Sequence, residues 1–356
     1  MRILQLAPVW ETVPPPAYGG TESVVSALTE QLVSRGHEVR LCASGDSITA
    51  AELFSVVPKS LRLAGLTDCA LQYAAVHTVR SLAEAGDFDI VHNHNGPPLD
   101  FAMAMSSIVP VPMLTTVHNM PEPRHELIWQ SYEGWYNTIS RRQAEVLPIL
   151  PRAKFAGVVY NAIEVETFPF RARKGDYVLF LGRLSAEKAP HLAIEAARRA
   201  GRRIVLAGKV GTAAEAEYFE AKVAPLLRLP GVEYVGEADA ATKRELFAGA
   251  RALLLPILWE EPFGLVMVEA MACGTPVVAF RRGAAPEIVV DGETGFLVDD
   301  LAGMTAALDK LDAIDHHRCR ALVEERFSPA TLANRYLAIY GTILGIEERT
   351  LGRVAV

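Results

Sequence analysis

The first half of the chain alternates between short apolar runs and longer segments whose apolar residues recur every three or four positions. Short apolar runs predict buried strands, and the longer period predicts helices. The alternation begins with a strand over 2–7, a helix over 21–35 and a strand over 39–43. Further strands are expected over 89–92, 113–118 and 155–160, and further helices near 69–85, 97–107 and 138–150. Repeated units of this kind imply a parallel sheet with helices on both faces.

The alternation pauses over 163–176 and then restarts, which predicts a second domain. The pause contains Pro169, Gly175 and three basic residues, a composition typical of a linker. The later strands are expected over 177–182, 203–207, 232–235, 252–256, 276–280 and 295–298. The predicted fold class is therefore α/β, with two doubly wound, Rossmann-like parallel-sheet domains at 1–165 and 170–327. Ser328 and Pro329 predict the start of a last helix that runs to about Leu344.

The composition narrows the class of protein. The chain has 356 residues, which is too long for one typical core, and 50% of them are hydrophobic while 22% are charged. The formal net charge of −7 argues against general nucleic-acid binding. No apolar run approaches the roughly 20 residues of a transmembrane helix, and the N-terminus is too short in apolar length for a signal peptide. Four widely spaced cysteines without a C-x-x-C pair favour reduced thiols and a cytoplasmic location.

The segment 261–269 carries the clearest chemistry. A turn at Pro262 and Gly264 leads into a short apolar helix, which is predicted over 265–272. The first amides of such a helix lack internal partners and carry partial positive charge, so they suit a phosphate. Glu269, one turn along, is placed to accept two hydrogen bonds from a vicinal diol, and Glu261 lies nearer to whatever is attached beyond the phosphate. The pattern suggests a sugar nucleotide, with its ribose on Glu269 and its sugar on Glu261.

Four segments resemble the signature sequences of family-4 retaining glycosyltransferases. They are 18–22, 182–188, 261–279 and 286–298, and they follow the family's usual order over nearly the whole chain. The resemblance implies the GT-B architecture, with a cleft between the carboxyl ends of two sheets. It also implies that the first domain binds the acceptor and includes the C-terminal helical segment 328–356. The second domain is then expected to bind the nucleotide sugar. Retention of the anomeric configuration is likewise implied by the family and not by spacing.

Two cations, Arg183 and Lys188, follow the first strand of the second domain. A diphosphate leaving group gains charge as the sugar bond breaks, so cations placed there stabilise the transition state. Because two side chains supply that charge, no metal ion and no other cofactor are expected. Taken alone, the two residues fit solvated loop charges, and the downstream segment 261–269 favours the catalytic reading. Ala189 stands where the family commonly has glycine.

Further donor contacts come from the resemblance. Gly19 and Gly20, before the first helix, are placed over the donor phosphate, although a lone Gly-Gly also fits an ordinary turn. His118, at a strand end, is placed against the donor sugar, although a lone histidine there is more often structural. Val235 is placed near the base. The turn and helix start are expected to bind the nucleotide through Phe263, Gly264, Leu265 and Val266.

Two further features leave alternatives open. Trp259 and Phe263 flank Glu261, and large aromatic side chains there suit either stacking on a sugar or filling the core. His92 and His94 are separated by one residue, and their rings are expected on opposite faces of the strand, which disfavours a metal site. The histidine pair fits either an acceptor-side role or a structural one.

The sequence therefore favours a retaining glycosyltransferase that moves a hexose from a nucleoside-diphosphate sugar, with UDP-hexose as the expected donor. The catalytic residues are expected to be Glu261, His118, Arg183 and Lys188. The hydroxyl acceptor, whether a small molecule, a glycan or a lipid-linked group, and the oligomeric state are not indicated. The alternatives are another enzyme of this architecture, such as a sugar-nucleotide epimerase or a phosphorylase, and a non-catalytic sugar-nucleotide sensor. The lack of a G-x-G-x-x-G fingerprint weakens an oxidoreductase reading.

Overall fold

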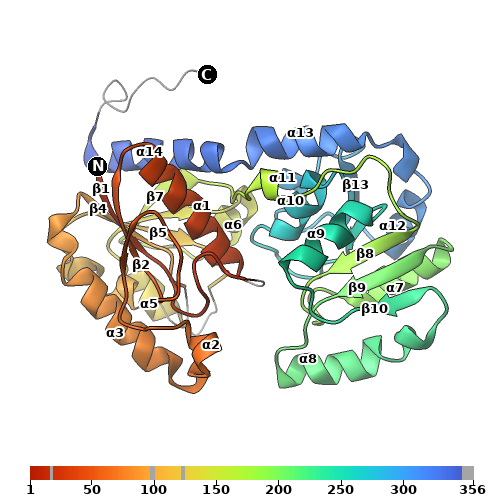
Figure 1. Cartoon of the computed structure of the whole chain (residues 1–356), viewed down its shortest axis with the longest axis horizontal. Helices are drawn as coiled ribbons and strands as arrows, with labels where there is room; N and C mark the ends of the chain where they lie inside the picture. Colours follow the sequence, from red (N-terminus) through yellow and green to blue (C-terminus); the bar gives the residue numbers. More distant parts are fainter. Residues whose placement is uncertain (17–18, 97–100, 122–124, 347–356) are drawn as a thin grey trace. The chain divides into compact units, whose positions relative to one another are not determined.

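The computed structural model describes residues 1–16, 19–96, 101–121 and 125–346 (Figure 1). These residues form two compact units. The first is Met1–Ala162 together with the C-terminal segment from Pro329, and the second is Ile163–Ser328. Within the described ranges, no helix combines the length and the apolar character that crossing a membrane requires.

The first unit is built on a parallel sheet with the strand order β3-β2-β1-β4-β5-β6-β7. The central strand β1 pairs with β2 on one side and β4 on the other, so that Ile3 lies opposite both Val39 and Ile90. A sheet whose strand order reverses in this way binds ligands outside its carboxyl edge. The strands are β1 Arg2–Leu6, β2 Glu38–Cys42, β3 Glu52–Phe54, β4 Ile90–Asn93, β5 Met113–Val117, β6 Trp135–Thr138 and β7 Lys154–Val158.

The last helix of the chain, α14 Pro329–Leu344, belongs to the first unit and packs beside α1 Gly20–Ser34 (Figure 1). Arg35, at the end of α1, donates hydrogen bonds to Asn334 Oδ1 at 2.6 Å and to Ala330 O at 3.1 Å. Tyr336 and Tyr340, one turn apart on α14, are fully buried. The remaining α-helices of this unit are α2 Leu61–Ala64, α3 Ala70–Leu82, α4 Ala102–Met105, α5 Glu126–Ser131 and α6 Arg141–Val146.

Two strands of this sheet are missing from the sequence prediction. The edge strand β3 has only three residues, too few for a period to show. Strand β6 contains Asn137 and Thr138, which are buried but polar, so a hydrophobic pattern does not mark them. The helix expected over 138–150 is correspondingly shorter, because Ser140 Oγ caps α6 by accepting a hydrogen bond from Gln143 N at 3.0 Å.

The second unit contains a parallel sheet with the order β10-β9-β8-β11-β12-β13. All six strands that the sequence predicts for this domain are present, each within two residues of its expected bounds. The strands are β8 Tyr177–Leu181, β9 Arg203–Ala207, β10 Val232–Tyr234, β11 Leu253–Leu255, β12 Val277–Phe280 and β13 Gly295–Val298.

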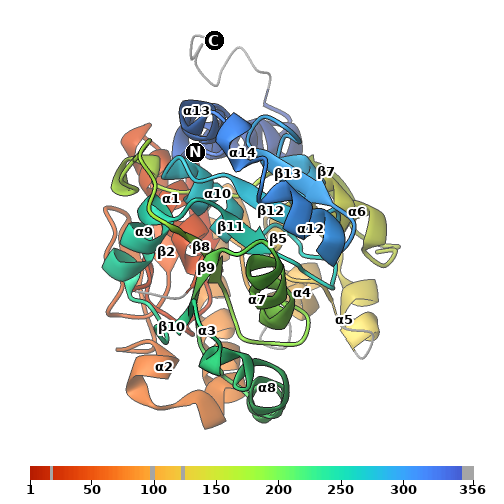
Figure 2. The same ribbon diagram turned by 90° about the vertical axis from the view of Figure 1, so that its right-hand side faces the viewer.

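Helices cover this second sheet on both faces. Helices α7 and α12 pack together against one face (Figure 2), where Ala193 and Met304 meet Phe180, Leu206 and Val278 in a buried cluster. The alternate side chains of the same strands point to the other face. The α-helices of this unit are α7 Pro190–Arg199, α8 Ala213–Tyr218, α9 Ala240–Gly249, α10 Leu265–Ala272, α11 Ala285–Ile288, α12 Leu301–Ala307 and α13 His316–Arg326.

The segment 163–176, expected to be a linker, is instead packed into the second unit. Phe168 is buried, and Lys174 Nζ donates hydrogen bonds to Ala248 O, Cys273 O and Thr275 Oγ1 at 3.2, 2.8 and 2.8 Å. Burial lowers the pKa of Lys174 to about 8. A basic side chain that suggested solvent exposure therefore joins the carboxyl ends of α9 and α10, because helix C-termini present unpaired carbonyls that attract a cation.

The loops that leave β8, β9 and β10 approach one another closely at the carboxyl edge of the sheet. Leu184 N donates a hydrogen bond to Lys209 O at 3.0 Å, and Gly208 N donates to Gly236 O at 2.8 Å. A Cβ atom on Gly208 would overlap Gly182 O. This close packing positions the loop after β8, which carries the two cations predicted to bind a diphosphate.

Gly208→Ala should therefore destabilise the second unit, because the added methyl group meets backbone that cannot rotate away. We expect a loss of about 3 kcal/mol, at the upper end of overpacking costs. The matched control is Gly201→Ala, since Gly201 has a φ of 62° but no atom within 4 Å of the place that an added methyl group would take. It should lose only about 1–2 kcal/mol, the strain of one left-handed residue. Urea unfolding followed by circular dichroism measures both, and equal losses would contradict the steric argument.

Candidate functional site

Helix α10 begins at Leu265, as the sequence predicts, and its first turn is set by Gly264. Gly264 has a φ of 85°, and a Cβ atom there would lie 2.8 Å from Met267 Cε. The helix is buried from Met267 onward. Because its interior is enclosed while its first residues, Leu265 and Val266, are only half-buried, the free amides of its first turn are the part of α10 that a ligand reaches.

Glu261, just before this turn, is held by its backbone and by its carboxylate. Ala284 N donates a hydrogen bond to Glu261 O at 2.9 Å, and a Cβ atom on Gly283 would overlap the Glu261 backbone. The residue is buried, with 9% of its surface exposed. Its Oε2 pairs with Lys188 Nζ and also accepts a hydrogen bond from Trp259 Nε1 at 2.9 Å. The structure thus brings together two predicted catalytic residues, Glu261 and Lys188.

Lys188 reaches Glu261 because the loop after β8 makes a tight turn at Ala189. Ala189 has a φ of 49°, the one left-handed conformation among the non-glycine residues that the structure describes. It caps the start of α7, and its N donates a hydrogen bond to Ser185 O at 3.0 Å. Ala189, which stands where the family commonly has glycine, therefore adopts the left-handed conformation that glycine favours, at a strain of roughly 1–2 kcal/mol.

Arg183, the other predicted cation, also has carboxylate partners. Its two terminal nitrogens each lie 2.6 Å from a carboxylate, one from Glu187 and one from Glu215. Glu215 is buried, and its Oε2 accepts a hydrogen bond from Gly211 N at 2.6 Å, whereas the Glu187 side chain is 39% exposed. The expected pair of cations is present, but each cation is already neutralised by an acidic neighbour.

Glu269 lies on the buried side of α10 and is 8% exposed. Lys243 Nζ, from α9, lies 2.6 Å from Glu269 Oε1. The sequence analysis missed Lys243 and Glu215 because ion pairs between separate elements leave no spacing signal. It missed Glu187, four residues after Arg183, because the segment is a loop, where this spacing does not imply contact. Val235, predicted to lie near a base, is 40% exposed and directly precedes Gly236, whose φ is 78°.

In the first unit, His118 follows β5 and takes part in a buried imidazole network. His118 Nε2 lies 3.0 Å from His94 Nδ1, and His94 Nε2 lies 2.6 Å from Gln5 Oε1. Burial lowers the pKa of His118 to about 3 and that of His94 well below its ordinary value, so both rings are neutral. If Gln5 accepts from His94, His118 donates to His94 and its Nδ1 is left as an acceptor.

The prediction that His92 and His94 point to opposite faces is wrong. Residues two apart along an extended chain share a face, because successive side chains alternate, and the two ring centroids accordingly lie 3.9 Å apart. His92 binds Tyr340 and Thr116 through its two nitrogens, at 2.6 and 2.7 Å. It therefore joins α14 to the sheet and has a structural role, one of the two alternatives that the sequence left open.

Gly19 and Gly20 open α1 at the carboxyl edge of the first sheet. Gly19 has a φ of 151°, and a Cβ atom on it would lie 2.7 Å from Pro15 Cβ and 3.1 Å from Glu22 Oε2. Burial, with Glu11 nearby, raises the pKa of the Glu22 carboxyl to about 7. Tyr18, part of the same signature, lies outside the described residues. The convergence of Gly19, Gly20 and His118 on the donor of the second unit stays a prediction.

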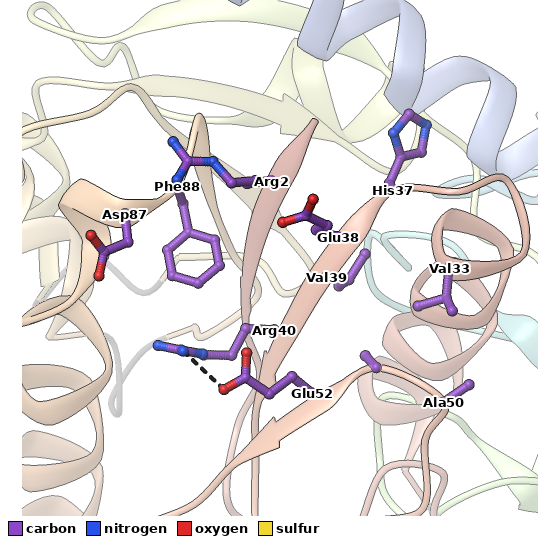
Figure 3. Close-up of a pocket in the computed structure, with 11 residues that line it drawn as sticks. Arg2, Val33, His37, Glu38, Val39, Arg40, Ala50, Glu52, Asp87 and Phe88 are labelled. Atoms are coloured by element: carbon purple, nitrogen blue, oxygen red, sulfur yellow. Dashed lines mark ion pairs between the residues drawn. The ribbon is translucent and has the colours of Figure 1, made fainter.

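A separate pocket of about 460 Å³ lies at the amino edge of the first sheet (Figure 3). Asp87 lines this pocket, and Asp89, which completes an Asp-x-Asp pair with it in the sequence, accepts a hydrogen bond from Arg2 N at 2.7 Å. Arg40 pairs with Glu52 at 2.9 Å. The pocket lies away from the carboxyl edge where such sheets bind ligands. In the described ranges, no cluster of three or more potential metal ligands occurs.

Two family models match the chain. The model for Glycosyltransferase Family 4 matches residues 18–155, and the model for Glycosyl transferases group 1 matches residues 164–324. Together the two matches span most of both units.

Two curated proteins are similar to this chain over most of its length. Glycogen synthase of Mycobacterium tuberculosis is 28% identical, over 86% of this chain and 85% of its own. The phosphatidyl-myo-inositol mannosyltransferase of Mycolicibacterium smegmatis is 28% identical, over 97% of this chain and 95% of its own.

Solved structures extend the likeness to the fold. AviGT4, a glycosyltransferase involved in avilamycin A biosynthesis, superposes with a TM-score of 0.70 at 26% identity, over 97% of this chain and 98% of its own. HepE of Anabaena, in complex with UDP and glucose, gives a TM-score of 0.71 at 20% identity, over 96% of this chain and 100% of its own. With two Rossmann-like sheets and family models matching both units, this chain belongs to the family-4 glycosyltransferases and is a glycosyltransferase of the GT-B fold.

Proposed function

We propose that this glycosyltransferase moves a hexose from a UDP-hexose to a hydroxyl acceptor, with retention of configuration and without a metal ion. The observation that carries the proposal is the start of α10. There Glu261, paired with Lys188, directly precedes a helix start suited to phosphate, and Glu269 lies on the same helix. This is the order in which the sugar, diphosphate and ribose of a nucleotide sugar occur.

Glu269 is suited to the ribose. One of its oxygens binds Lys243, and a carboxylate has about four lone-pair positions, so acceptor capacity remains for a vicinal diol. The exposed Val235 and the glycine after it suit a flat base. The names of the similar proteins support a hexose donor, since HepE was solved with UDP and glucose and a curated relative is a mannosyltransferase.

Arg183 and Lys188 are suited to the leaving diphosphate. Their carboxylate partners lower the net positive charge that the empty site presents, so the diphosphate competes with Glu187 for Arg183 and with Glu261 for Lys188. As the sugar bond breaks, the diphosphate gains charge and becomes the stronger partner. The departing phosphate oxygen then takes the proton of the attacking hydroxyl, which is the front-face route that the family implies. Neutral His118 supplies an uncharged acceptor for a sugar hydroxyl.

The two units take separate roles in this proposal. The second binds the donor, and the first, with α14, provides Gly19, Gly20 and His118 and binds the acceptor. Membership of the family disfavours the epimerase, phosphorylase and sensor alternatives. The cysteines Cys42, Cys69, Cys273 and Cys319 are all unpaired, which supports a reducing compartment and thus the cytoplasm.

Incubation with single nucleotide sugars tests the proposal, because water replaces a missing acceptor slowly. Of UDP-glucose, UDP-galactose, GDP-mannose and ADP-glucose, we expect a uridine donor to be hydrolysed to the α-sugar, with an unchanged rate in excess EDTA. Proton NMR reads the anomer at early times. Release of the β-sugar would show inversion, loss of activity with EDTA and its return with magnesium or manganese would show metal dependence, and binding without hydrolysis would favour a sensor.

The two glutamates should separate binding from turnover. Glu269→Gln should weaken UDP binding by about ten- to hundredfold, the value of a charged hydrogen bond, because the ribose contact exists in ground and transition states alike. Glu261→Gln should bind UDP nearly as the wild type does and lose most of its turnover, because its contact is with the sugar. Calorimetry and initial rates measure both. The reverse pattern would mean that the two ends of the donor site are exchanged.

Removing the charge of Glu187, which competes with the diphosphate for Arg183, should strengthen nucleotide binding. Glu187→Gln frees Arg183 from its exposed partner, and we expect the affinity for UDP to rise by up to about fivefold, since exposed pairs are worth about 0.2–1 kcal/mol. Glu195→Gln is the matched control, because Glu195 pairs with Arg198 and Arg199 on the surface of α7. Calorimetry at constant salt distinguishes them. Weaker binding by Glu187→Gln would show that Glu187 positions Arg183 and does not compete for it.

A further inference from the structure

Trp259 contacts both members of the Lys188–Glu261 pair. Its Nε1–H donates to Glu261 Oε2 at 2.9 Å, and Lys188 Nζ lies 5.2 Å from the centroid of its ring. The ring face thus meets the cation while the ring edge meets the carboxylate. The sequence offered sugar stacking or core filling for this residue, and the geometry supplies a third role.

Lys188 and Trp259 both donate hydrogen bonds to Glu261 Oε2, and the two groups respond differently when a nucleotide sugar binds. Lys188 carries a positive charge, so a diphosphate attracts it away from Glu261. The indole N–H is neutral and can only donate, so a phosphate does not draw it away comparably. No hydrogen bond to Oε1 of Glu261 is found among the described residues, and this oxygen is left for the sugar. With Lys188 alone, Glu261 would lose its anchor when the donor arrives.

We propose that Trp259 is a positioning residue, which holds Glu261 through its indole N–H while Lys188 turns to the donor diphosphate. This inference rests on the proposed function, in which Glu261 contacts the donor sugar. The backbone of Glu261 is fixed independently by Ala284 N, so the indole hydrogen bond needs only to select the side-chain rotamer. Trp259 itself turns about only two side-chain bonds, so little freedom is lost in holding it.

The first test needs no substrate. Selective ¹⁵N labelling resolves the indole N–H signals of the four tryptophans, and Trp259→Phe assigns one of them. We expect the Trp259 N–H to exchange slowly with solvent in the wild type and to remain protected in Lys188→Met. In Glu261→Gln, whose amide is a weaker acceptor, the signal should shift and exchange faster. Loss of protection in Lys188→Met would overturn the proposal, because it would show that Lys188 orders the pair and the indole only follows.

The second test separates positioning from stacking and packing. Trp259→Phe keeps an aromatic face for Lys188 or a sugar but removes the indole N–H group that donates to Glu261. With UDP-glucose hydrolysis as the assay, we expect kcat to fall about tenfold or more, with the UDP dissociation constant changed less than twofold. Trp259→His, assayed near pH 8 where an unperturbed imidazole is neutral, restores a ring N–H at an equivalent place and should recover part of kcat.

The matched control is Trp135→Phe, because Lys154 Nζ lies 5.2 Å from the Trp135 ring, as Lys188 does from that of Trp259. It should leave kcat unchanged. A Trp259→Phe enzyme with wild-type kcat beside an inactive Glu261→Gln enzyme would overturn the positioning role alone. If Glu261→Gln keeps its turnover, the proposed function of Glu261 fails, whereas the exchange experiment still decides whether Trp259 holds the carboxylate.

Discussion

A carboxylate with almost no exposure to water is the constraint around which the second unit's site is arranged. Glu261 is buried beside a helix start, and burying a charge without partners is costly. Lys188 and Trp259 both satisfy it, while Ala284 and the contact with Gly283 fix its backbone. Other features serve this arrangement, since the left-handed Ala189 directly follows Lys188. Contacts within the protein therefore hold both the backbone and the carboxylate of Glu261.

The same arrangement explains why this site is not strongly cationic. Arg183, Lys188 and Lys243 each have a carboxylate partner, so their charges are compensated within the protein. Compensation stabilises the site, because unpaired cations in one site would repel one another. In the proposed mechanism it makes donor binding an exchange of partners, and the charge that develops on a leaving diphosphate would shift that exchange toward the transition state.

The first unit follows a different principle, with neutral hydrogen bonds in place of ion pairs. His92, His94 and His118 are buried together, and burial keeps their pKa values low enough for all three to stay uncharged. His92 links the sheet to Tyr340 of α14, while His94 contacts His118. A neutral network of this kind fixes the orientation of His118 without placing a charge where a donor sugar is proposed to bind.

The sequence by itself determined the fold class, most strands and the bounds of α10, because each depends on local periodicity or on turn residues, and it predicted the residues of a donor site from signatures that span a few positions. Strand β6 was not predicted, because Asn137 and Thr138 are buried polar residues that a hydrophobic pattern cannot mark. Lys174 was misjudged because only the tertiary structure brings the ends of α9 and α10 to it. The partners of the catalytic residues were decided in the same way. Lys188 and Glu261 are 73 positions apart, and Lys243 and Glu269 are 26 apart, so nothing in their spacing reveals the ion pairs that folding creates.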